Sequence, residues 1–314
     1  MTTSPASQAN WNPRLREIYL KELIDHLQRL LPGDGHAEPV VGLHLFRVSS
    51  PTDLRHGVLE PALCVIAQGA KELTLSGRRY RYDPYHYLIV TLGLPVTTRV
   101  VEASPERPYL SLRFDLAPEL VGSVLVQSGY RLQERSSPVA ALDVSPLETG
   151  LLESVVRYVR LARDPEEARV LAPLVRREIV FRLLQGAQGD RLQHVAVLHG
   201  KRHRISRAIA RMRREFDRPL RVEDLAREAG MSLSAFYQHF RAVTGMTPLQ
   251  FQKRLRLYTA RERMILQDLD AATAAFEVGY ESPSHFSREY KRLFGASPAR
   301  DVQRLRRTLL GAAG

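Results

Sequence analysis

Residues 279–295 have the sequence GYESPSHFSREYKRLFG, and this stretch decides the fold of the last part of the chain. After a glycine turn, Ser282 is suited to cap a helix and Pro283 suits its first position. Phe286 and Tyr290 repeat at helical spacing, so they form the buried stripe of a short helix. The opposite side carries Ser, His, Arg and Lys. Such a helix has an apolar back for a small core and a front of hydrogen-bonding groups.

The same pattern occurs fifty residues earlier in the chain. SLSAFYQHFRAVTGMTPLQFQKRLR aligns with SPSHFSREYKRLFGASPARDVQRLR, so that Ser, Phe, Gly, Pro and an Arg-Leu-Arg run recur in register. A short helical segment ending in glycine precedes each copy, VEDLAREAG and ATAAFEVG. A helix, a turn containing glycine and a second helix make a helix-turn-helix. The repeat therefore predicts two such units, at about 220–245 and 270–295.

The outward faces of the two second helices are suited to nucleic acid. Arg288 can bind guanine with two hydrogen bonds, and Gln238 can bind adenine in the same way. Other basic side chains suit phosphates, which position a protein without reading sequence. We expect phosphate contacts from Arg241, Lys253, Arg254, Lys291 and Arg292. For one isolated helix a solvated polar face would be the simpler interpretation, but two matched units in a basic region favour DNA.

The charge distribution agrees with this interpretation. The chain has 314 residues and a formal net charge of +12, and residues 191–314 hold 24 Lys and Arg against 12 Asp and Glu. The whole excess therefore lies in the C-terminal region, which indicates a polyanionic partner, with nucleic acid ahead of a membrane surface.

Composition places the chain among ordinary globular proteins. Hydrophobic residues make up 44% and charged residues 25%. Cys64 is the single cysteine, so no intrachain disulfide is possible and a reducing compartment fits. The first residues, MTTSPASQANWNPR, lack the apolar core that a secretion signal needs, so we expect none, and no apolar run approaches the roughly 18 residues of a membrane span. We expect a cytoplasmic protein without a membrane partner.

The N-terminal part has a different texture. Residues 13–31 form an amphipathic helix, and residues 40–116 alternate short β-branched and aromatic runs with turn residues, which predicts an antiparallel sandwich or small barrel. KELTLSGRRYRYD is expected to be a hairpin. Helical periodicity returns in residues 117–190. The apolar stripes of these helices either pack against the β unit or form a dimerisation surface. Residues 186–192, GAQGDRL, are expected to be the linker.

The C-terminal pattern is that of a known family. Residues 200–308 resemble the DNA-binding domain of AraC/XylS-type transcription regulators, most clearly in GYESPSHFSREYKRLFGASPARDVQRLR. In that family a long helix bridges two helix-turn-helix units that enter successive major-groove segments, and residues 249–266 resemble the bridge. The resemblance implies base contacts by Ser234, Tyr237 and Gln238 in the first unit and by Pro283, Ser284, His285, Ser287 and Arg288 in the second.

The chain departs from the family pattern at two places. Arg221 stands where a Ser or Thr cap is usual, and the acidic Glu223 and Asp224 compensate in part at the positive end of the helix. Ala271 and Ala274 replace larger aliphatic residues before the second turn, so looser packing is expected in the second unit.

The N-terminal part also resembles this family. EPALCVIAQGAKEL, YRYDPYHYLIV and EASPERPYLSLRFDL are similar to a cupin-like, effector-sensing barrel in one branch of these regulators. The resemblance implies a one-component regulator that a small-molecule effector modulates. Tyrosine offers an apolar body with a polar tip, which suits an organic ligand. The expected effector-pocket residues are Glu60, Gln68, Tyr80, Tyr82, Tyr85, His86 and Tyr87.

Two alternatives remain open at this point: a cupin-type metalloenzyme with a DNA-binding tail, and a regulator without a small-molecule effector. The metal site would need closely spaced histidines, but His36, His44, His56 and His86 are isolated in the sequence. Cys64 lies in an apolar strand, so packing in the core is a simpler role for it than redox or aldehyde sensing. We expect no enzyme activity, no cofactor and no metal.

The prediction is thus an α+β multidomain protein. Residues 1–116 hold an N-terminal helix and a cupin-like antiparallel β-barrel or sandwich, residues 117–190 a helical dimerisation or linker region, and residues 191–314 an all-α tandem helix-turn-helix domain. The expected partners are double-stranded DNA, a small-molecule effector and a second copy of the chain, with RNA polymerase as a further candidate.

Overall fold

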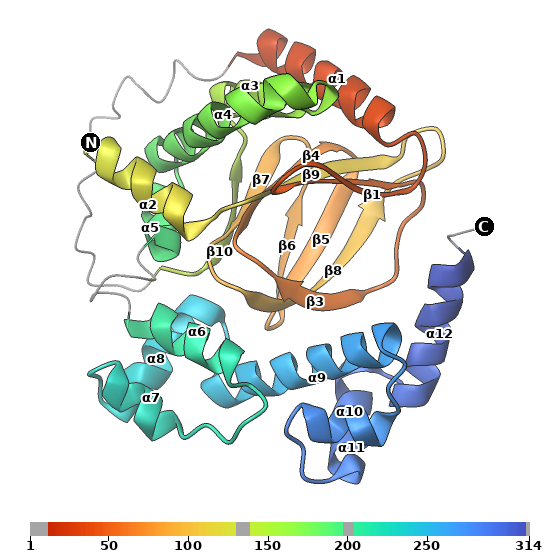
Figure 1. Cartoon of the computed structure of the whole chain (residues 1–314), viewed down its shortest axis with the longest axis vertical. Helices are drawn as coiled ribbons and strands as arrows, with labels where there is room; N and C mark the ends of the chain where they lie inside the picture. Colours follow the sequence, from red (N-terminus) through yellow and green to blue (C-terminus); the bar gives the residue numbers. More distant parts are fainter. Residues whose placement is uncertain (1–11, 130–138, 197–203, 312–314) are drawn as a thin grey trace. The chain divides into compact units, whose positions relative to one another are not determined.

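The computed structural model describes residues 12–129, 139–196 and 204–311 (Figure 1). The chain divides into two compact units, Met1–His203 and Arg204–Gly314. The linker expected at 186–192 belongs to the N-terminal unit instead, because Gln188 and Leu192 are buried in it. The Gln188 amide also donates a hydrogen bond to Ser145 Oγ. These contacts anchor the segment, although its glycines predicted a flexible linker.

The N-terminal unit is an antiparallel sandwich of two sheets. The six-stranded sheet has the order β1-β2-β9-β4-β7-β10, and the four-stranded sheet has the order β3-β8-β5-β6. All pairings are antiparallel. The strands are β1 (Gly35–Val40), β2 (Leu43–Val48), β3 (Arg55–Leu59), β4 (Ala62–Gln68), β5 (Ala70–Leu75), β6 (Arg78–Tyr82), β7 (His86–Val90), β8 (Leu94–Glu102), β9 (Tyr109–Asp115) and β10 (Leu142–Pro146).

The hairpin predicted from KELTLSGRRYRYD is confirmed. β5 pairs with β6 from Lys71 opposite Tyr82 to Leu75 opposite Arg78. The two residues of the turn, Ser76 and Gly77, both have positive φ, 50° and 84°. Positive φ at both positions gives the turn a twist that matches the right-handed twist of the strands, as two-residue hairpins require.

Helices cover one face of the six-stranded sheet (Figure 1). Alternate residues of β4 and β9, such as Leu63 and Phe114, pack with the helices in one hydrophobic core. That core includes buried residues of the region 117–190, for example Val156 and Val180. Packing against the β unit therefore accounts for the buried apolar residues of this region. The helices are α1 (Pro13–Leu30), α2 (Pro118–Gln127), α3 (Thr149–Arg160), the 3-10 helix η2 (Leu161–Arg163), α4 (Pro165–Gln185) and α5 (Gly189–Ala196).

The C-terminal unit is helical, and it contains the two predicted helix-turn-helix units. The first consists of α7 and α8, the second of α10 and α11, and α9 is the bridge expected at 249–266 (Figure 1). The predicted α+β fold with a C-terminal all-α domain is confirmed. The helices are α6 (Arg204–Arg214), α7 (Val222–Glu228), α8 (Leu233–Thr244), α9 (Pro248–Leu266), α10 (Ala271–Glu277), α11 (Pro283–Phe294) and α12 (Pro298–Gly311).

The helix ends follow from the sequence. The hydroxyls of Ser232 and Ser282 accept hydrogen bonds from the third following backbone N–H, as predicted for N-caps. Thr247 and Gln250 make a reciprocal capping box at the start of α9. Arg221 gives α7 no side-chain cap, in line with the departure from the family pattern.

Candidate nucleic-acid interface and ligand cavity

Helix α8 has the two faces that the sequence predicted. Phe236 and Phe240 are fully buried, and the ring of Phe240 meets that of Phe251 on α9 edge to face, with 5.6 Å between centroids. Ser234 and Gln238 are exposed on the other side of the helix, and Tyr237 is half-buried. The aromatic back holds the helix in the core, so the polar front faces solvent.

Helix α11 repeats this arrangement. Its back rests on a series of aromatic rings, in which Phe286 lies 5.3 Å from Tyr280 and 5.5 Å from Tyr290 between centroids. Both Phe286 and Tyr290 are fully buried. On the front of the helix, Ser284, His285 and Arg288 are exposed, and Pro283 and Ser287 are half-buried.

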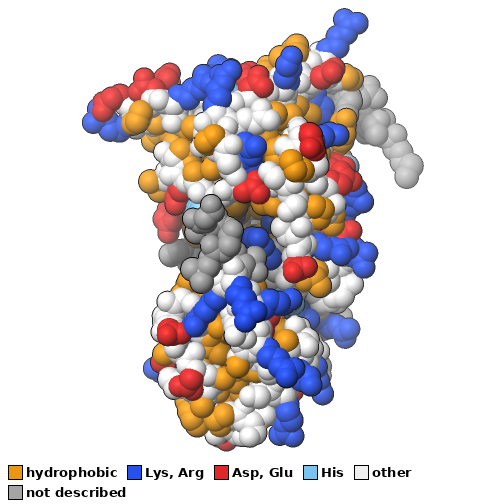
Figure 2. Space-filling view, turned by 90° about the vertical axis from the view of Figure 1, so that its right-hand side faces the viewer, with side chains coloured by type: hydrophobic (Ala, Val, Ile, Leu, Met, Phe, Trp, Pro, Cys, Tyr) orange, Lys and Arg blue, Asp and Glu red, His pale blue; other side chains and the backbone are white. Residues whose placement is uncertain are grey.

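The two candidates for bidentate base contacts are unengaged in the part of the chain that the structure describes. Within the described residues, the side chains of Gln238 and Arg288 form no hydrogen bond or ion pair with the protein. The same holds for Arg241 and Lys291, both of which are exposed. On the face of the C-terminal unit seen in Figure 2, Lys and Arg side chains predominate over Asp and Glu. The four side chains can therefore exchange water for a ligand without breaking an internal contact.

Two of the expected phosphate contacts have an acidic neighbour. The Lys253 ammonium lies 2.5 Å from Glu289 Oε2, and an Arg292 nitrogen lies 3.6 Å from Glu289 Oε1. The hydrogen bond from Lys253 lowers the pKa of Glu289, so this carboxyl stays charged at neutral pH. Lys253 and Arg292 are therefore weaker candidates for phosphate binding than Arg241, Arg254 and Lys291.

Arg256 on the bridging helix ties the two helix-turn-helix units together. Its guanidinium donates to the carbonyl oxygens of Phe216 at 2.7 Å, of Gly279 at 2.7 Å and of Arg218 at 3.0 Å. The first and third belong to the segment before α7, and Gly279 is in the turn before α11. Because one planar group binds both segments, the separation between α8 and α11 is fixed by short contacts.

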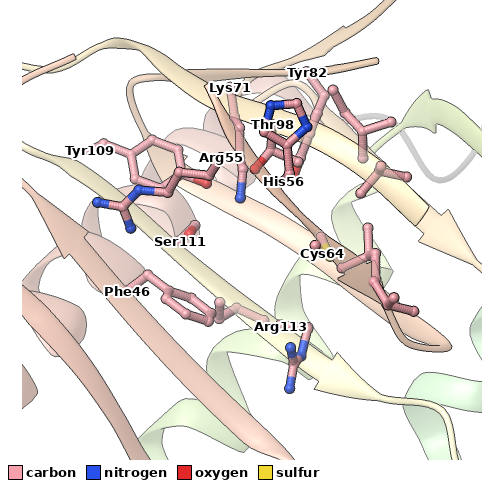
Figure 3. A pocket seen from close by; sticks show the side chains of 16 residues that line it. Phe46, Arg55, His56, Cys64, Lys71, Tyr82, Thr98, Tyr109, Ser111 and Arg113 are labelled. Atoms are coloured by element: carbon pink, nitrogen blue, oxygen red, sulfur yellow. The ribbon is translucent and has the colours of Figure 1, made fainter. Parts of the chain in front are cut away.

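The N-terminal unit contains a cavity of about 240 Å³ between the two sheets (Figure 3). Apolar lining comes from side chains such as Phe46, Leu73 and Val96, and polar lining from Tyr109 and Ser111. The cavity is also lined by four basic side chains, Arg55, His56, Lys71 and Arg113.

The strand pattern explains how Lys71 reaches this cavity. Successive side chains in a strand point to opposite faces. On β5, Leu73 is 1% and Leu75 is 6% exposed, so Lys71 shares the inward face with two core leucines. The outward neighbour Glu72 instead pairs with Arg99 on β8 at 2.7 Å.

Burial shapes the chemistry of the cavity. It raises the pKa of the Cys64 thiol to about 11, so the thiol is protonated at neutral pH and a poor nucleophile. It also lowers the pKa of Lys71, with further lowering by the charges of Arg55 and Arg113. Lys71 remains partly accessible because its side chain lines the cavity.

The residues expected to form an effector pocket are mostly elsewhere. Tyr82 lines the cavity, and Tyr80 is buried on the same inward face of β6, as expected. Tyr85 is 57% exposed under the Arg16 guanidinium, and Tyr87 belongs to the core beneath the helices. His86 bonds to Asp83, Gln68 donates to the Pro108 carbonyl, and Glu60 is half-buried outside the cavity lining.

The structure also brings together histidines that are separate in the sequence. His36 Nε2 and His44 Nδ1 lie 3.3 Å apart, and His44 Nε2 lies 3.0 Å from Asp115 Oδ2. Strand pairing of β1 with β2 makes this contact, and burial lowers the pKa of His36. In the part of the chain that the structure describes, no group of three or more such ligands is arranged to hold a metal ion.

Comparison with known proteins decides the family. The model of the AraC-type transcriptional regulator N-terminus matches residues 39–191, and that of a helix-turn-helix domain matches residues 225–304. The chain belongs to the AraC-type transcriptional regulators. Members of this family are DNA-binding transcription regulators, and the sequence predicted this function.

Similar proteins support this assignment. The HTH-type transcriptional regulator ExsA of Pseudomonas aeruginosa is 28% identical over 179 residues, which cover 57% of this chain and 63% of ExsA. The thermoregulatory protein LcrF of Yersinia pestis is 23% identical over 250 residues, which cover 76% of this chain and 88% of LcrF. The regulator thus aligns with less than two thirds of ExsA and with most of LcrF.

A solved structure has the same fold. ToxT of Vibrio cholerae, crystallised with a bound unsaturated fatty acid, superimposes with a TM-score of 0.53 at 11% identity, covering 83% of the regulator and 94% of ToxT. Within the described part of the regulator, no helix is long and apolar enough to cross a membrane.

Proposed function

We propose that this regulator reads a specific duplex DNA sequence with α8 and α11, and that a small molecule in the N-terminal cavity modulates the binding. The single observation that carries the proposal is the matched pair of helices, each with a buried aromatic back and a front of unengaged polar groups. Helices of this kind enter the major groove, where base edges differ in donors and acceptors.

Base reading is assigned to the exposed fronts. Gln238 on α8 and Arg288 on α11 are the side chains best suited to bidentate contacts, each worth about 1–3 kcal/mol of discrimination. The other base-contact candidates are Ser234, Tyr237, Pro283, Ser284, His285 and Ser287. Arg241, Arg254 and Lys291 would bind phosphates, which contributes affinity that falls with salt.

The effector proposal is supported by the cavity itself. A largely apolar cavity with a few converging polar groups is the usual form of a small-molecule site. The fatty acid in ToxT lies in a protein of the same fold. A ligand would act by favouring one arrangement of the two units over another. The shift in this equilibrium would be set by the difference in the ligand's affinity for the two arrangements.

We also propose that the regulator works as a homodimer through α4. Val170 is 63%, Leu174 is 60% and Phe181 is 43% exposed, and the three lie along one stripe of this helix. The opposite side of α4 is buried in the core. An exposed apolar stripe of this kind is typical of an interaction surface. RNA polymerase would be a partner only when the bound site lies beside a promoter.

The proposal is tested by selection from random duplex DNA with the full chain, with excess competitor DNA present. We expect a motif with two boxes about one helical turn apart, the repeat of the major groove. Gln238→Ala should relax one box and Arg288→Ala the other. Binding that depends only on salt, with no motif, would refute sequence-specific reading.

Matched controls separate reading from charge. Gln303 and Arg300 are exposed on α12, outside both recognition helices. Gln303→Ala and Arg300→Ala should leave the motif unchanged, and Arg300→Ala should at most weaken binding uniformly. If these controls relax a box as much as the recognition-helix variants do, the assignment of the reading residues is wrong.

A further inference from the structure

The cavity in the N-terminal unit has an excess of positive charge. Lys71 comes from β5, Arg55 from β3 and Arg113 from β9, and Figure 3 shows the three side chains arranged around the same space. No Asp or Glu is among the described residues that line it. An apolar cavity with several cations and no carboxylate has an unbalanced field, which attracts an anion.

Two of the three cations have no partner among the residues that the structure describes. Arg113 Nε lies 3.2 Å from Asp115 Oδ1, so its charge is partly balanced. The side chains of Lys71 and Arg55 have no hydrogen bond or ion pair with any described residue. Each therefore retains its full capacity to donate to a ligand.

The position of Lys71 is costly for a protein that uses the cavity only for packing. A charge placed among apolar groups without a partner is unfavourable, and an apolar residue there would generally be more stable. Its inward neighbours on β5, Leu73 and Leu75, are the residue type that this face otherwise carries. A buried charge without a partner, in a cavity, is a candidate for a functional site.

The volume limits the size of the occupant. A cavity of about 150 Å³ is known to hold one benzene molecule. The cavity of about 240 Å³ therefore has room for one six-membered ring and a small acid group. Phe46, Leu73 and Val96 supply the apolar wall that a ring would contact.

We propose that this cavity binds a small organic anion, an acid group on an apolar body about the size of one ring, with the acid group held by Lys71 and Arg55. This proposal rests on the proposed function of the N-terminal unit as the ligand-binding part, and it names the chemical class of the ligand. Charge-assisted hydrogen bonds from an ammonium and a guanidinium would orient the acid group.

Isothermal titration of the full chain tests the proposal with benzoate, phenyl phosphate and the neutral benzamide. Benzoate and benzamide have similar shapes and differ in charge, so benzoate should bind at least about tenfold more tightly, the size expected for one hydrogen bond to a charged group. Comparing benzoate with phenyl phosphate distinguishes a carboxylate site from a phosphate site.

Two variants locate the binding. Lys71→Met keeps the length of the side chain and removes the charge, so it should weaken benzoate binding at least about tenfold. It should also keep or raise the melting temperature of the ligand-free protein, because it removes an unpartnered charge. Arg55→Gln, at an exposed position, provides a second variant if Lys71→Met does not fold. Arg79→Gln, on the outward face of β6, is the matched control and should bind benzoate like the wild type.

Three results would overturn the proposal: benzamide binding as tightly as benzoate, wild-type affinity in both Lys71→Met and Arg55→Gln, or no binding of either anion at millimolar concentration. These failures differ from failure of the proposed DNA-binding function. Selection of a DNA motif needs no ligand, so a clear motif without anion binding would refute only the identity of the ligand.

Discussion

Arg261 on α9 and Asp301 on α12 form a buried, two-pronged ion pair. Arg261 Nε lies 2.7 Å from Asp301 Oδ2, and Nη2 lies 3.0 Å from Oδ1. The Tyr290 hydroxyl on α11 donates to the same carboxylate at 2.9 Å. One carboxylate thus joins the bridging helix, the last helix and the buried back of the second recognition helix. This network holds the buried back of α11, the helix whose exposed front carries Arg288.

Removing the carboxylate should destabilise the second helix-turn-helix unit. Asp301→Ala leaves the Arg261 guanidinium, which is 6% exposed, without its partner. Loss of one member of a buried pair costs about 3–5 kcal/mol. Hydrogen exchange of amides in α9, α11 and α12 would measure the free energy of opening. The control is Glu277→Ala, which removes a half-exposed pair with Arg263 and should cost less than about 1 kcal/mol. Equal losses in the two variants would contradict the role given to burial.

Acid should release the same network. Burial alone would raise the pKa of Asp301, but hydrogen bonds from Arg261 and Tyr290 outweigh it and lower this pKa below the ordinary 3.8. A carboxyl with a lowered folded-state pKa stabilises the fold fully above its unfolded pKa, and this contribution is lost as pH falls through the folded value. Between pH 5 and the folded-state pKa of Asp301, stability of the C-terminal unit should therefore fall more steeply in the wild type than in Asp301→Asn. Parallel pH profiles in hydrogen exchange would show that Asp301 is not the titrating group.

A methyl group at Gly279 should be far more damaging than one at Gly295. Both glycines have positive φ, 85° and 79°. A Cβ at Gly279 would lie 1.8 Å from the Asp217 carbonyl oxygen, whereas a Cβ at Gly295 would have nothing within 4 Å. Gly295→Ala should therefore cost about 1–2 kcal/mol for backbone strain alone. Gly279→Ala adds a clash that must separate the segment before α7 from the turn before α11.

The measurement is the affinity of each variant for DNA sites that differ in the spacing between the two boxes. Gly279→Ala should lose at least about tenfold in affinity for the selected site, a change equivalent to 1.4 kcal/mol, because α8 and α11 no longer match the groove repeat. Gly295→Ala should retain the spacing preference of the wild type. If Gly279→Ala binds the selected site normally, the contact between these segments does not set the spacing.

Features that depend on local sequence could be predicted before the structure. The caps Ser232 and Ser282 and the aromatic stripes of α8 and α11 involve residues within one or two helical turns, so their spacing is sufficient. The Ser76-Gly77 hairpin is local in the same sense. The repeat then extended these local signals to the tandem helix-turn-helix arrangement.

The cavity could not be predicted in the same way. Arg55 and Arg113 lie on strands of different sheets, and only the packing of the two sheets brings them together. The aromatic residues expected to share a pocket lie apart, because after the turn before β7 Tyr85 faces solvent and Tyr87 faces the helices. One signal was present in the sequence: Lys71 alternates with Leu73 and Leu75, which places a charge on an inward face.

The apolar stripe of α4 should mediate dimerisation. Leu174→Glu introduces a charge into the stripe that also includes Val170 and Phe181, without touching the buried side of the helix. If two copies meet through this stripe, burying two like charges there would disfavour the dimer strongly, by several kcal/mol. Sedimentation velocity should then show a dimer for the wild type and a monomer for Leu174→Glu, both with the same far-ultraviolet circular dichroism. Val126→Glu is the matched control, because Val126 is 83% exposed on α2 and lies outside the stripe. A monomeric wild type, or a dimer that Leu174→Glu leaves intact, would assign dimerisation to another surface or exclude it.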